Sequence, residues 1–531
     1  MSRRKAPPAA LQAFRHLFAS VTDEMGIALR DSAVSPNVKE RLDFSCALLD
    51  ARGRLVAHAA HIPVHLGSAH LTVPRVLEEL DPGPGDVVVL NDPHRGGTHL
   101  NDVTVVAPLY AGGQRLGFLL DRAHHADIGG AEPGSMSGAR DLYGEGLCLP
   151  PVLLVRAGEP VADVWRLFQA NVRDPDAARG DLLAQCAALH RGGARFAELV
   201  ARFGAGEIAA AMEALHAHGA RMSSALLGAW PKRAARAEDS LDGPGTPRIA
   251  VRLQVRGGRL TVDFRGSSPQ VPGSWNTHEA VATSAVFFVL QSLADDELPE
   301  TSGTLEPVEL LLPESSVVAS GFPAGVALGN VETSQRIVDV LLAALRGLLP
   351  DQVPAASQGT MNNLLFGGRR ADGTPFVYYE TLGGGGGAGL SAAGAHAVQS
   401  HMTNTRNTPV EVFESELPVR VRELALRRGS GGRGARRGGD GLVKTVEFLE
   451  PARVTVAATR RRTRPAGAQG GEDGRAAADR VMRADGRSAR AEGTQAMEPG
   501  DCIRISTPGG GGHGTAPRRE RGGAARGDRT G

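Results

Sequence analysis

Residues 91–127 contain a dense group of side chains that can bind a metal ion. The segment opens with Asn91-Asp92-Pro93-His94-Arg95-Gly96-Gly97-Thr98-His99-Leu100-Asn101-Asp102 and closes with His124-His125-Ala126-Asp127. Four His and four Asp fall within these 37 residues. Imidazole nitrogen and carboxylate oxygen together form a ligand set for divalent transition metals. The segment therefore predicts a metal site.

His99, Asp102 and His124 are the predicted ligands. A spacing of three residues lets His99 and Asp102 face one ion from a turn, while His124 reaches it from a neighbouring strand. Adjacent strand residues point to opposite faces, so His124 and His125 are not expected to bind the same ion, and His125 is the second choice. Three protein ligands with an open position would make a Lewis acid or hold an activated water. The alternative is a set of hydrogen-bonded structural residues.

Asp92, Asp127 and Arg406 are the predicted catalytic residues. Either aspartate could orient a ligand histidine or accept a proton. Arg406 lies in the polar run 401–411, where its guanidinium could bind a substrate carboxylate or imide as a fork. An interdomain hydrogen-bond network explains the same run equally well.

Two further stretches have a composition typical of sites but a less specific spacing. His58, His61, His65 and His70 have no carboxylates nearby, and of these we consider His65 able to reach the pocket. Backbone N–H groups of Gly383–Gly387 or Gly509–Gly514 could hold a phosphate or an oxyanion. No Gly-Lys-Ser/Thr follows, so neither is a P-loop, and tight turns are the favoured interpretation. ATP is then expected on another chain.

The elements that must position these groups are strands joined by turns. Helical spacing covers residues 9–31, 161–228, 278–294 and 331–348, and strands are expected at 44–49, 55–57, 87–90, 103–110, 116–120, 249–255 and 260–264. The His and Asp groups thus fall at strand ends, where sites are usually built. We expect a linker at 236–247 and loops at 427–441 and 459–496.

Because helices and strands occur in separate runs, the predicted class is α+β, with several domains, mixed sheets and helical segments. The predicted organisation is a metal-site region (1–160), a helical region (161–240), a C-terminal α+β region with Gly-rich loops (241–514) and a disordered tail (515–531).

Composition excludes several classes of protein. The formal net charge is +1, which gives no indication of nucleic-acid or membrane binding. The four cysteines form no C-x-x-C pair, which argues against a zinc knuckle or disulfide framework and for a reducing compartment. No apolar run reaches about 18 residues, and no signal peptide is recognised. We expect a cytoplasmic protein.

Ordered motifs from about residue 10 to Gly514 resemble the hydantoinase B / 5-oxoprolinase family, which includes N-methylhydantoinase B subunits. They are similar also to the corresponding subunits of acetone and acetophenone carboxylases. The motifs are Ser35–Ser45, Ile62–Gly67, Asn91–Pro93, Gly96–His99, Asp102-Val103, His124–Gly130, Gly329–Gln335, Gln358–Asn363, Tyr379–Thr381, Thr403–Pro409 and Pro508–Gly512. Two departures are His94, where the family often has an aromatic residue, and a weak Arg464–Gly467 segment.

The resemblance implies the B subunit of an ATP-dependent amidohydrolase that opens a cyclic amide of the hydantoin or 5-oxoproline type. A hydantoinase A-like partner, actin-like in fold, would bind ATP and phosphorylate the substrate in a hetero-oligomer. The resemblance also implies a divalent metal of the Mn, Zn or Fe type, at positions that correspond to His99, Asp102 and His124. The alternatives are a subunit of an ATP-dependent ketone carboxylase and a non-catalytic scaffold for the A subunit.

Overall fold

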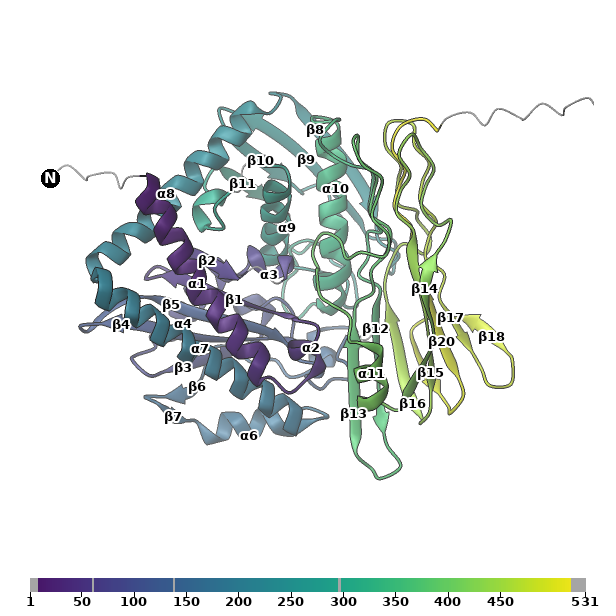
Figure 1. Cartoon of the computed structure of the whole chain (residues 1–531), viewed down its shortest axis with the longest axis horizontal. Coiled ribbons are helices and arrows are strands. Elements are labelled where there is room, and N and C mark those ends of the chain that lie inside the picture. Colours follow the sequence, from purple (N-terminus) through teal and green to yellow (C-terminus); the bar gives the residue numbers. More distant parts are fainter. Residues whose placement is uncertain (1–7, 60–61, 137–138, 295–297, 517–531) are drawn as a thin grey trace, which may run out of the picture.

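The structure, a computed structural model, describes residues 8–59, 62–136, 139–294 and 298–516. Within these ranges the strands form four sheets. Figure 1 shows the N-terminal sheet and its helices beside the middle part of the chain, with the C-terminal strands on the far side. This mixed architecture of several sheets and helices confirms the predicted class. Of the predicted tail, residues 517–531 lie outside the described part of the chain.

The first sheet positions the metal-binding candidates. Its strand order is β2-β1-β5-β4-β3-β6-β7, and neighbouring strands run antiparallel. The strands are β1 (Phe44–Asp50), β2 (Leu55–Ala59), β3 (Val87–Leu90), β4 (Asp102–Ala111), β5 (Gln114–His124), β6 (Val152–Arg156) and β7 (Glu159–Pro160). The predicted strands from 44 to 120 are therefore confirmed.

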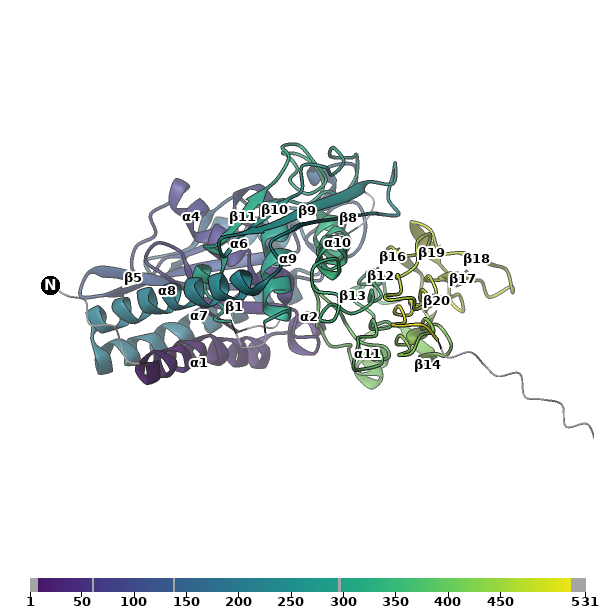
Figure 2. The same ribbon diagram turned by 90° about the horizontal axis from the view of Figure 1, so that it is seen from above.

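Helices cover both faces of this sheet. Alternating residues of β1 show the division: Cys46 and Leu48 pack with α1 and α7, whereas Ala47 and Leu49 pack with α4. The helices are α1 (Pro8–Ser32), α2 (Pro36–Lys39), α3 (Pro63–Leu66), α4 (Ala69–Glu79), α5 (Leu142–Glu145), α6 (Ala162–Ala170), α7 (Pro175–Phe203) and α8 (Ala205–Ala229). Figure 2 shows α1, α7 and α8 lying together along one side.

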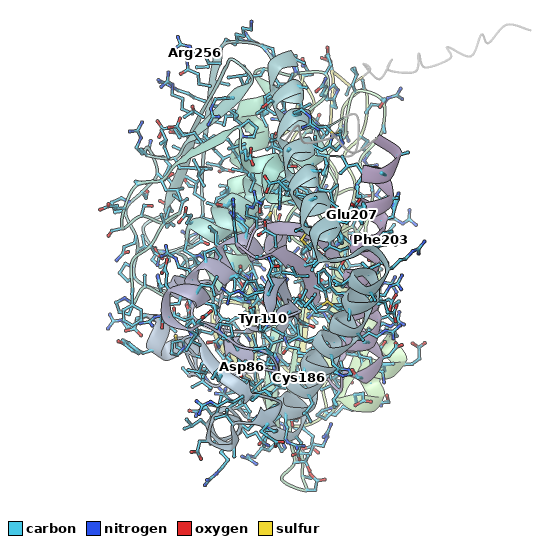
Figure 3. The ribbon with its side chains drawn as sticks, turned by 90° about the vertical axis from the view of Figure 1, so that its left-hand side faces the viewer. Asp86, Tyr110, Cys186, Phe203, Glu207 and Arg256 are labelled. Atoms are coloured by element: carbon cyan, nitrogen blue, oxygen red, sulfur yellow. The ribbon has the colours of Figure 1, made fainter. Side chains whose placement is uncertain are left out.

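Local sequence explains where the long helices begin and turn. Pro175 opens α7, and the Asp174 carboxylate accepts the Ala177 N–H at 3.0 Å, which satisfies an amide that the helix leaves free. Gly204 separates α7 from α8 with a φ of +81°, a backbone conformation that favours glycine. In Figure 3, Phe203 and Glu207 mark this bend, and Cys186 lies farther along α7.

The middle of the chain builds a second sheet, of order β11-β10-β9-β8, under two helices. Its elements are β8 (Ala234–Ser240), β9 (Arg248–Arg256), β10 (Arg259–Asp263), β11 (Val308–Leu311), α9 (Glu279–Ser292) and α10 (Ser334–Arg346), with a π-helical turn, η3 (Gly329–Thr333), before α10. The prediction of a linker at 236–247 is wrong in its first half. In that half, β8 pairs with β9. The strand was missed because the polar residues of Ala234–Ser240 partly hide its alternation.

The C-terminal part consists of two sheets that share one apolar core. Their orders are β13-β12-β16-β19 and β14-β15-β20-β17-β18. The elements are β12 (Asn363–Arg369), β13 (Pro375–Glu380), α11 (Val410–Glu416), β14 (Val419–Arg427), β15 (Gly441–Phe448), β16 (Ala452–Ala457), β17 (Arg480–Met482), β18 (Ser488–Arg490), β19 (Thr494–Met497) and β20 (Cys502–Ser506). The predicted loop at 459–496 therefore contains three short strands.

Four glycine-rich segments beyond these sheets pack backbone against backbone, and we call them the glycine bundle: residues 383–389, 431–439, 467–474 and 509–514. The Gly439 N–H donates to Gly386 O, and the Gly510 N–H donates to Gly439 O, both at 2.9 Å. A Cβ built on Gly510 would lie 1.9 Å from Gly386 O. Only glycine allows backbones to approach so closely. The loop predicted at 427–441 is part of this bundle.

No helix in the described ranges is both long and apolar enough to cross a membrane. The four cysteines are all free, as their separation along the chain predicted.

Candidate metal centre

The structure brings His99, Asp102 and His124 together at one end of the first sheet. Their potential ligand atoms all lie within 4.8 Å of one another. Asp102 Oδ1 is 3.0 Å from His99 Nε2 and 3.2 Å from His124 Nδ1, and the two nitrogens are 3.2 Å apart. One ion could therefore contact all three side chains, as the spacing predicted.

Strand pairing explains this convergence. Asp102 begins β4 and His124 ends β5, and the two residues are direct partners in the antiparallel register. His99 lies in the turn that enters β4, where the Asp102 N–H donates to His99 O at 3.0 Å. The loop before it is tight, because a Cβ on Gly97 would lie 2.5 Å from Asn91 O. The turn thus delivers an imidazole to the carboxylate three residues later.

The two oxygens of Asp102 have different surroundings. Oδ1 faces the two histidines, whereas Oδ2 accepts from Thr98 Oγ1 at 2.6 Å and Asn330 Nδ2 at 3.4 Å. His65 Nε2 lies 3.1 Å from the same Oδ2, and its Nδ1 is 3.0 Å from Ser45 Oγ. Such outer contacts fix the orientation of a ligand carboxylate. They leave Oδ1 as the atom available to an ion.

The two histidines are held by other parts of the chain. His99 Nδ1 lies 3.5 Å from Ala327 O, an arrangement that places a proton on Nδ1 and leaves the Nε2 lone pair free for an ion. The Tyr379 ring of β13 stacks on His124 with centroids 4.5 Å apart and planes 25° apart. The Arg41 guanidinium also lies over this tyrosine ring, at 4.6 Å. His124 Nε2 is buried and has no hydrogen-bond partner among the described residues.

Electrostatics favour a positive charge at this point. Burial would raise the pKa of Asp102, but His99 and His65 hold it well below its usual range. Burial would lower the pKa of His99, but the Asp102 carboxylate raises it overall. Burial lowers the pKa of His124, against the hydrogen bond to Asp102. All three side chains are at most 3% exposed. The raised pKa means that Asp102 favours a proton on His99 Nε2. A cation bound between neutral imidazoles and the ionised carboxylate would replace that proton.

His65, which we considered able to reach the pocket, contacts Asp102, whereas the other predicted residues do not reach this cluster. His125 points to the other face of the sheet, where its Nε2 is 3.0 Å from Gln185 Oε1. Asp92 accepts the His94 N–H at 2.9 Å and caps the 3-10 turn η1 (Pro93–Arg95). These contacts fix local structure, and neither residue touches a ligand histidine.

Asp127 and Arg406 are likewise away from the cluster. Asp127 accepts from the amides of Gly129 and Gly134 and pairs with Arg173 Nη1 at 2.8 Å, so it fixes the loop after β5. Arg406 is exposed, and its backbone N–H donates to Arg41 O. No contact in the described structure supports the expectation that Asp92 or Asp127 orients a ligand histidine. The loops turn both carboxylates toward backbone amides instead.

The glycine segments are not open anion cradles. The N–H groups of Gly384, Gly385 and Gly386 donate to Val398 O, Pro508 O and Ala395 O. Those of residues 509–514 donate to backbone oxygens of Arg475, Gly439, Ala356, Glu472, Arg436 and Ala468. Donors that are used inside the protein cannot bind a phosphate. The glycines therefore have the structural role that we favoured over anion binding. Their contacts form a packed bundle rather than isolated tight turns.

Asn330 and Tyr379 are contacts that spacing alone did not assign to the site. Asn330 belongs to the π-helical turn η3, a local geometry frequent at functional sites. Its Oδ1 is buried and without a hydrogen-bond partner in the described structure. Asn330 and Tyr379 fall within motifs that the family resemblance had already marked, which was the available signal.

The family of this chain follows from comparisons with known proteins. The chain belongs to the hydantoinase B/oxoprolinase family, whose model matches residues 7–516. It is 37% identical to 5-oxoprolinase 1 of Arabidopsis thaliana over 536 residues, which cover 95% of this chain and 42% of that protein. The chain thus spans less than half the length of this relative.

Two solved structures share the fold. The ATP-dependent caprolactamase of Pseudomonas jessenii superposes with a TM-score of 0.89 at 26% identity, covering 97% of this chain and 93% of that one. An acetone carboxylase structure superposes with a TM-score of 0.87 at 17% identity, covering 96% of this chain and 76% of that one. The second likeness concerns the fold alone.

Proposed function

We propose that this chain is the B-type component of an ATP-dependent amidohydrolase that opens a cyclic amide of the hydantoin or 5-oxoproline type. The observation on which the proposal rests is the buried convergence of His99, Asp102 and His124. Family membership and the likeness to an ATP-dependent caprolactamase support this reaction class. A hydantoinase A-like ATPase would be the partner in a hetero-oligomer, since the Arabidopsis relative is more than twice as long as the match.

The donor set fits a divalent metal of the Mn, Zn or Fe type. Bound to His99 Nε2, Asp102 Oδ1 and His124 Nδ1, such an ion would polarise an amide oxygen or lower the pKa of a water. The protein's own contribution is placement. His65, Thr98 and Asn330 hold the Asp102 carboxylate through Oδ2. Tyr379 fixes the plane of the His124 ring. Deep burial of all three ligands excludes bulk water.

The division of labour follows from the chemistry. An amide is a poor electrophile, and phosphorylation of its oxygen by the partner's ATP would make its carbon reactive. The B-type chain then holds the activated ring beside the cluster while water attacks this carbon. The C–N bond breaks as the ring nitrogen takes up a proton, and a second water releases phosphate from the resulting acyl phosphate. The unpartnered Asn330 Oδ1 and His124 Nε2 are polar atoms able to bind the substrate or the attacking water.

The test compares Asp102→Asn with Asp121→Asn, a carboxylate on the opposite face of the same strand pair. Burial raises the pKa of Asp121 to about 8, so an uncharged amide replaces a largely protonated group there. With the A-type partner, ATP and a panel of hydantoins, 5-oxoproline and lactams, the wild type should form ring-opened product. Asp102→Asn should lose the metal, and its activity should fall more than about a hundredfold. This loss is larger than the one typical of a residue that only contacts a metal ligand.

Asp121→Asn should keep both metal and activity. Phosphate release without ring-opened product by the metal-loaded wild type would count against hydrolysis. Bicarbonate-dependent consumption of a ketone would favour the carboxylase instead. Full activity of a metal-free complex would favour the scaffold.

A further inference from the structure

A second polar cavity lies away from the metal-binding candidates, between the second sheet and the C-terminal part. Its volume is about 280 Å³. It is bounded by β8, by α10, by residues 355–357 and by the segment 460–466. None of its lining residues belongs to the metal-binding cluster. The cavity therefore calls for its own explanation.

Four charged groups at the base of this cavity neutralise one another. Arg336 Nη1 is 2.6 Å from Asp239 Oδ2, and Arg460 Nη2 is 2.9 Å from the same oxygen and 2.5 Å from Asp339 Oδ2. The His401 ring adds a contact to Asp339 at 3.4 Å. Glu238, the third acidic residue of the lining, pairs with Arg248 at 3.0 Å. No carboxylate remains in excess.

Two guanidinium groups of the lining have no carboxylate partner within the described ranges. Arg346 donates only to Pro354 O, at 2.6 and 3.2 Å, and forms no ion pair with a described residue; burial lowers its pKa, and the charge of the more distant Asp339 acts against this shift. Arg464 is exposed and makes no hydrogen bond or ion pair with any described residue. The Asp339 charge is already shared between Arg460 and His401. Counted together with Arg336 and Arg248, which pair with its acidic residues from outside the lining, the cavity has an excess of positive charge.

Two hydroxyl groups add donors to this charge. Ser357 Oγ accepts the Gly387 N–H at 3.1 Å, and Thr463 Oγ1 accepts from Arg460 Nη1 at 3.3 Å. Because each oxygen acts as an acceptor in these contacts, each hydroxyl proton is free to be donated. Ser357 and Thr463 come from two segments of the lining, 355–357 and 460–466, which the hydrogen bond from Ala356 N–H to Ala466 O joins at 2.9 Å. Fork-shaped guanidiniums together with hydroxyl donors match the oxygens of a phosphate group.

We propose that this cavity binds a phosphate group, either free phosphate or the phosphate of a small phosphorylated molecule, through Arg346, Arg464, Ser357 and Thr463. The oxygens of the anion lie between the two guanidiniums and accept the two hydroxyl protons. The Arg336–Asp239–Arg460–Asp339 network forms a rigid, charge-balanced floor. This site is independent of the metal cluster and of the proposed reaction.

The experiment titrates the full chain with inorganic phosphate by calorimetry, at constant ionic strength so that general charge screening does not change. Methyl phosphate represents a phosphorylated molecule, and succinate represents a carboxylate. Saturable phosphate binding is expected, and Arg464→Gln should weaken it about tenfold or more, the loss expected for one charge-assisted contact.

The matched control is Arg256→Gln. This exposed arginine lies at the tip of the β9–β10 hairpin (Figure 3). Along β9 it is six residues beyond Ala250, which pairs with the cavity residue Glu238 of β8. Phosphate affinity should be unchanged in this variant. Because Arg346 also donates to a backbone carbonyl, the folding of Arg346→Gln is checked first. If that variant does not fold, Arg464→Gln, whose side chain lies on the surface, decides the test.

Binding of methyl phosphate as well would identify phosphorylated molecules as ligands, and binding of inorganic phosphate alone would identify the free ion. The proposal is overturned if phosphate does not saturate the wild type, if Arg464→Gln binds as tightly as Arg256→Gln, or if succinate binds equally well. Each readout is a binding constant, so failure of the amidohydrolase proposal would leave these results unaffected.

Discussion

The candidate metal cluster of His99, Asp102 and His124 and the glycine bundle both have a composition that suggests a ligand site, yet they use their polar groups in opposite ways. In the cluster, side chains from separate turns meet, and atoms such as His124 Nε2 are left without a partner among the described residues. In the bundle, the N–H groups of residues 384–386 and 509–514 all donate to protein atoms. The comparison teaches that unsatisfied groups, rather than residue types, distinguish a site from a structural motif.

The largest effect should come from adding one methyl group to the glycine bundle. In Gly510→Ala the new Cβ would lie 1.9 Å from Gly386 O and 2.4 Å from Gly386 C, both rigid backbone atoms. We expect a loss of at least about 3 kcal/mol in the free energy of unfolding, at or above the upper end for overpacking. Urea denaturation measures it.

Gly193→Ala is the matched control, since its Cβ would meet nothing within 4 Å on α7. It should be neutral or stabilise the protein by up to about 1 kcal/mol through helix propensity. Equal stability of the two variants would show that the bundle is looser than described.

The stack of Tyr379 on His124 gives the second prediction. Tyr379→Leu removes the ring, whereas Tyr379→Phe keeps the ring and loses only the 3.0 Å hydrogen bond to Asn363 Oδ1. We expect the leucine variant to bind metal about tenfold more weakly, a typical loss for an outer contact, and the phenylalanine variant to stay close to the wild type. Competition with a chelator measures both affinities, and equal affinities in all three proteins would remove Tyr379 from the site.

The third prediction concerns the pH dependence of stability through His278, whose Nε2 lies 2.6 Å from Thr98 O beside the cluster. Burial lowers the pKa of His278 to about 3, so the unfolded chain takes up a proton below about pH 6.5 while the folded chain does not. The stability contributed by the neutral imidazole is complete above pH 6.5 and falls by up to about 1.4 kcal/mol per pH unit between pH 6.5 and 3.

His278→Asn should flatten this part of the curve of unfolding free energy against pH. The exposed His190→Asn is the control and should keep the wild-type slope. An unchanged slope in His278→Asn would show that the region around Thr98 does not control acid sensitivity.

Much of the local structure could be predicted from sequence. The apolar stripe of Phe18, Val21 and Met25 in α1 and the largely buried apolar runs of β4 and β5 reflect local backbone geometry. Strand alternation also separated His124 from His125 correctly. These features depend only on neighbours along the chain.

Long-range contacts could not be predicted in the same way. Tyr379 and Asn330 reach the cluster because later parts of the chain pack against the first sheet, and no spacing within residues 91–127 encodes this. Asp92 and Asp127 are acidic, but their loops turn them toward backbone amides. The glycine bundle likewise depends on partners more than a hundred residues away, as in the contact of Gly386 with Gly510.

The support of Asp102 and His124 by Asn330 and Tyr379 has a consequence for biosynthesis. A nascent chain that has emerged only as far as β5 possesses every predicted ligand but lacks the groups that fix two of them. Selective uptake at the proposed metal site should therefore begin only after β13 has been synthesised and has docked. The order of synthesis would then protect the ligands from binding an unsuitable ion too early.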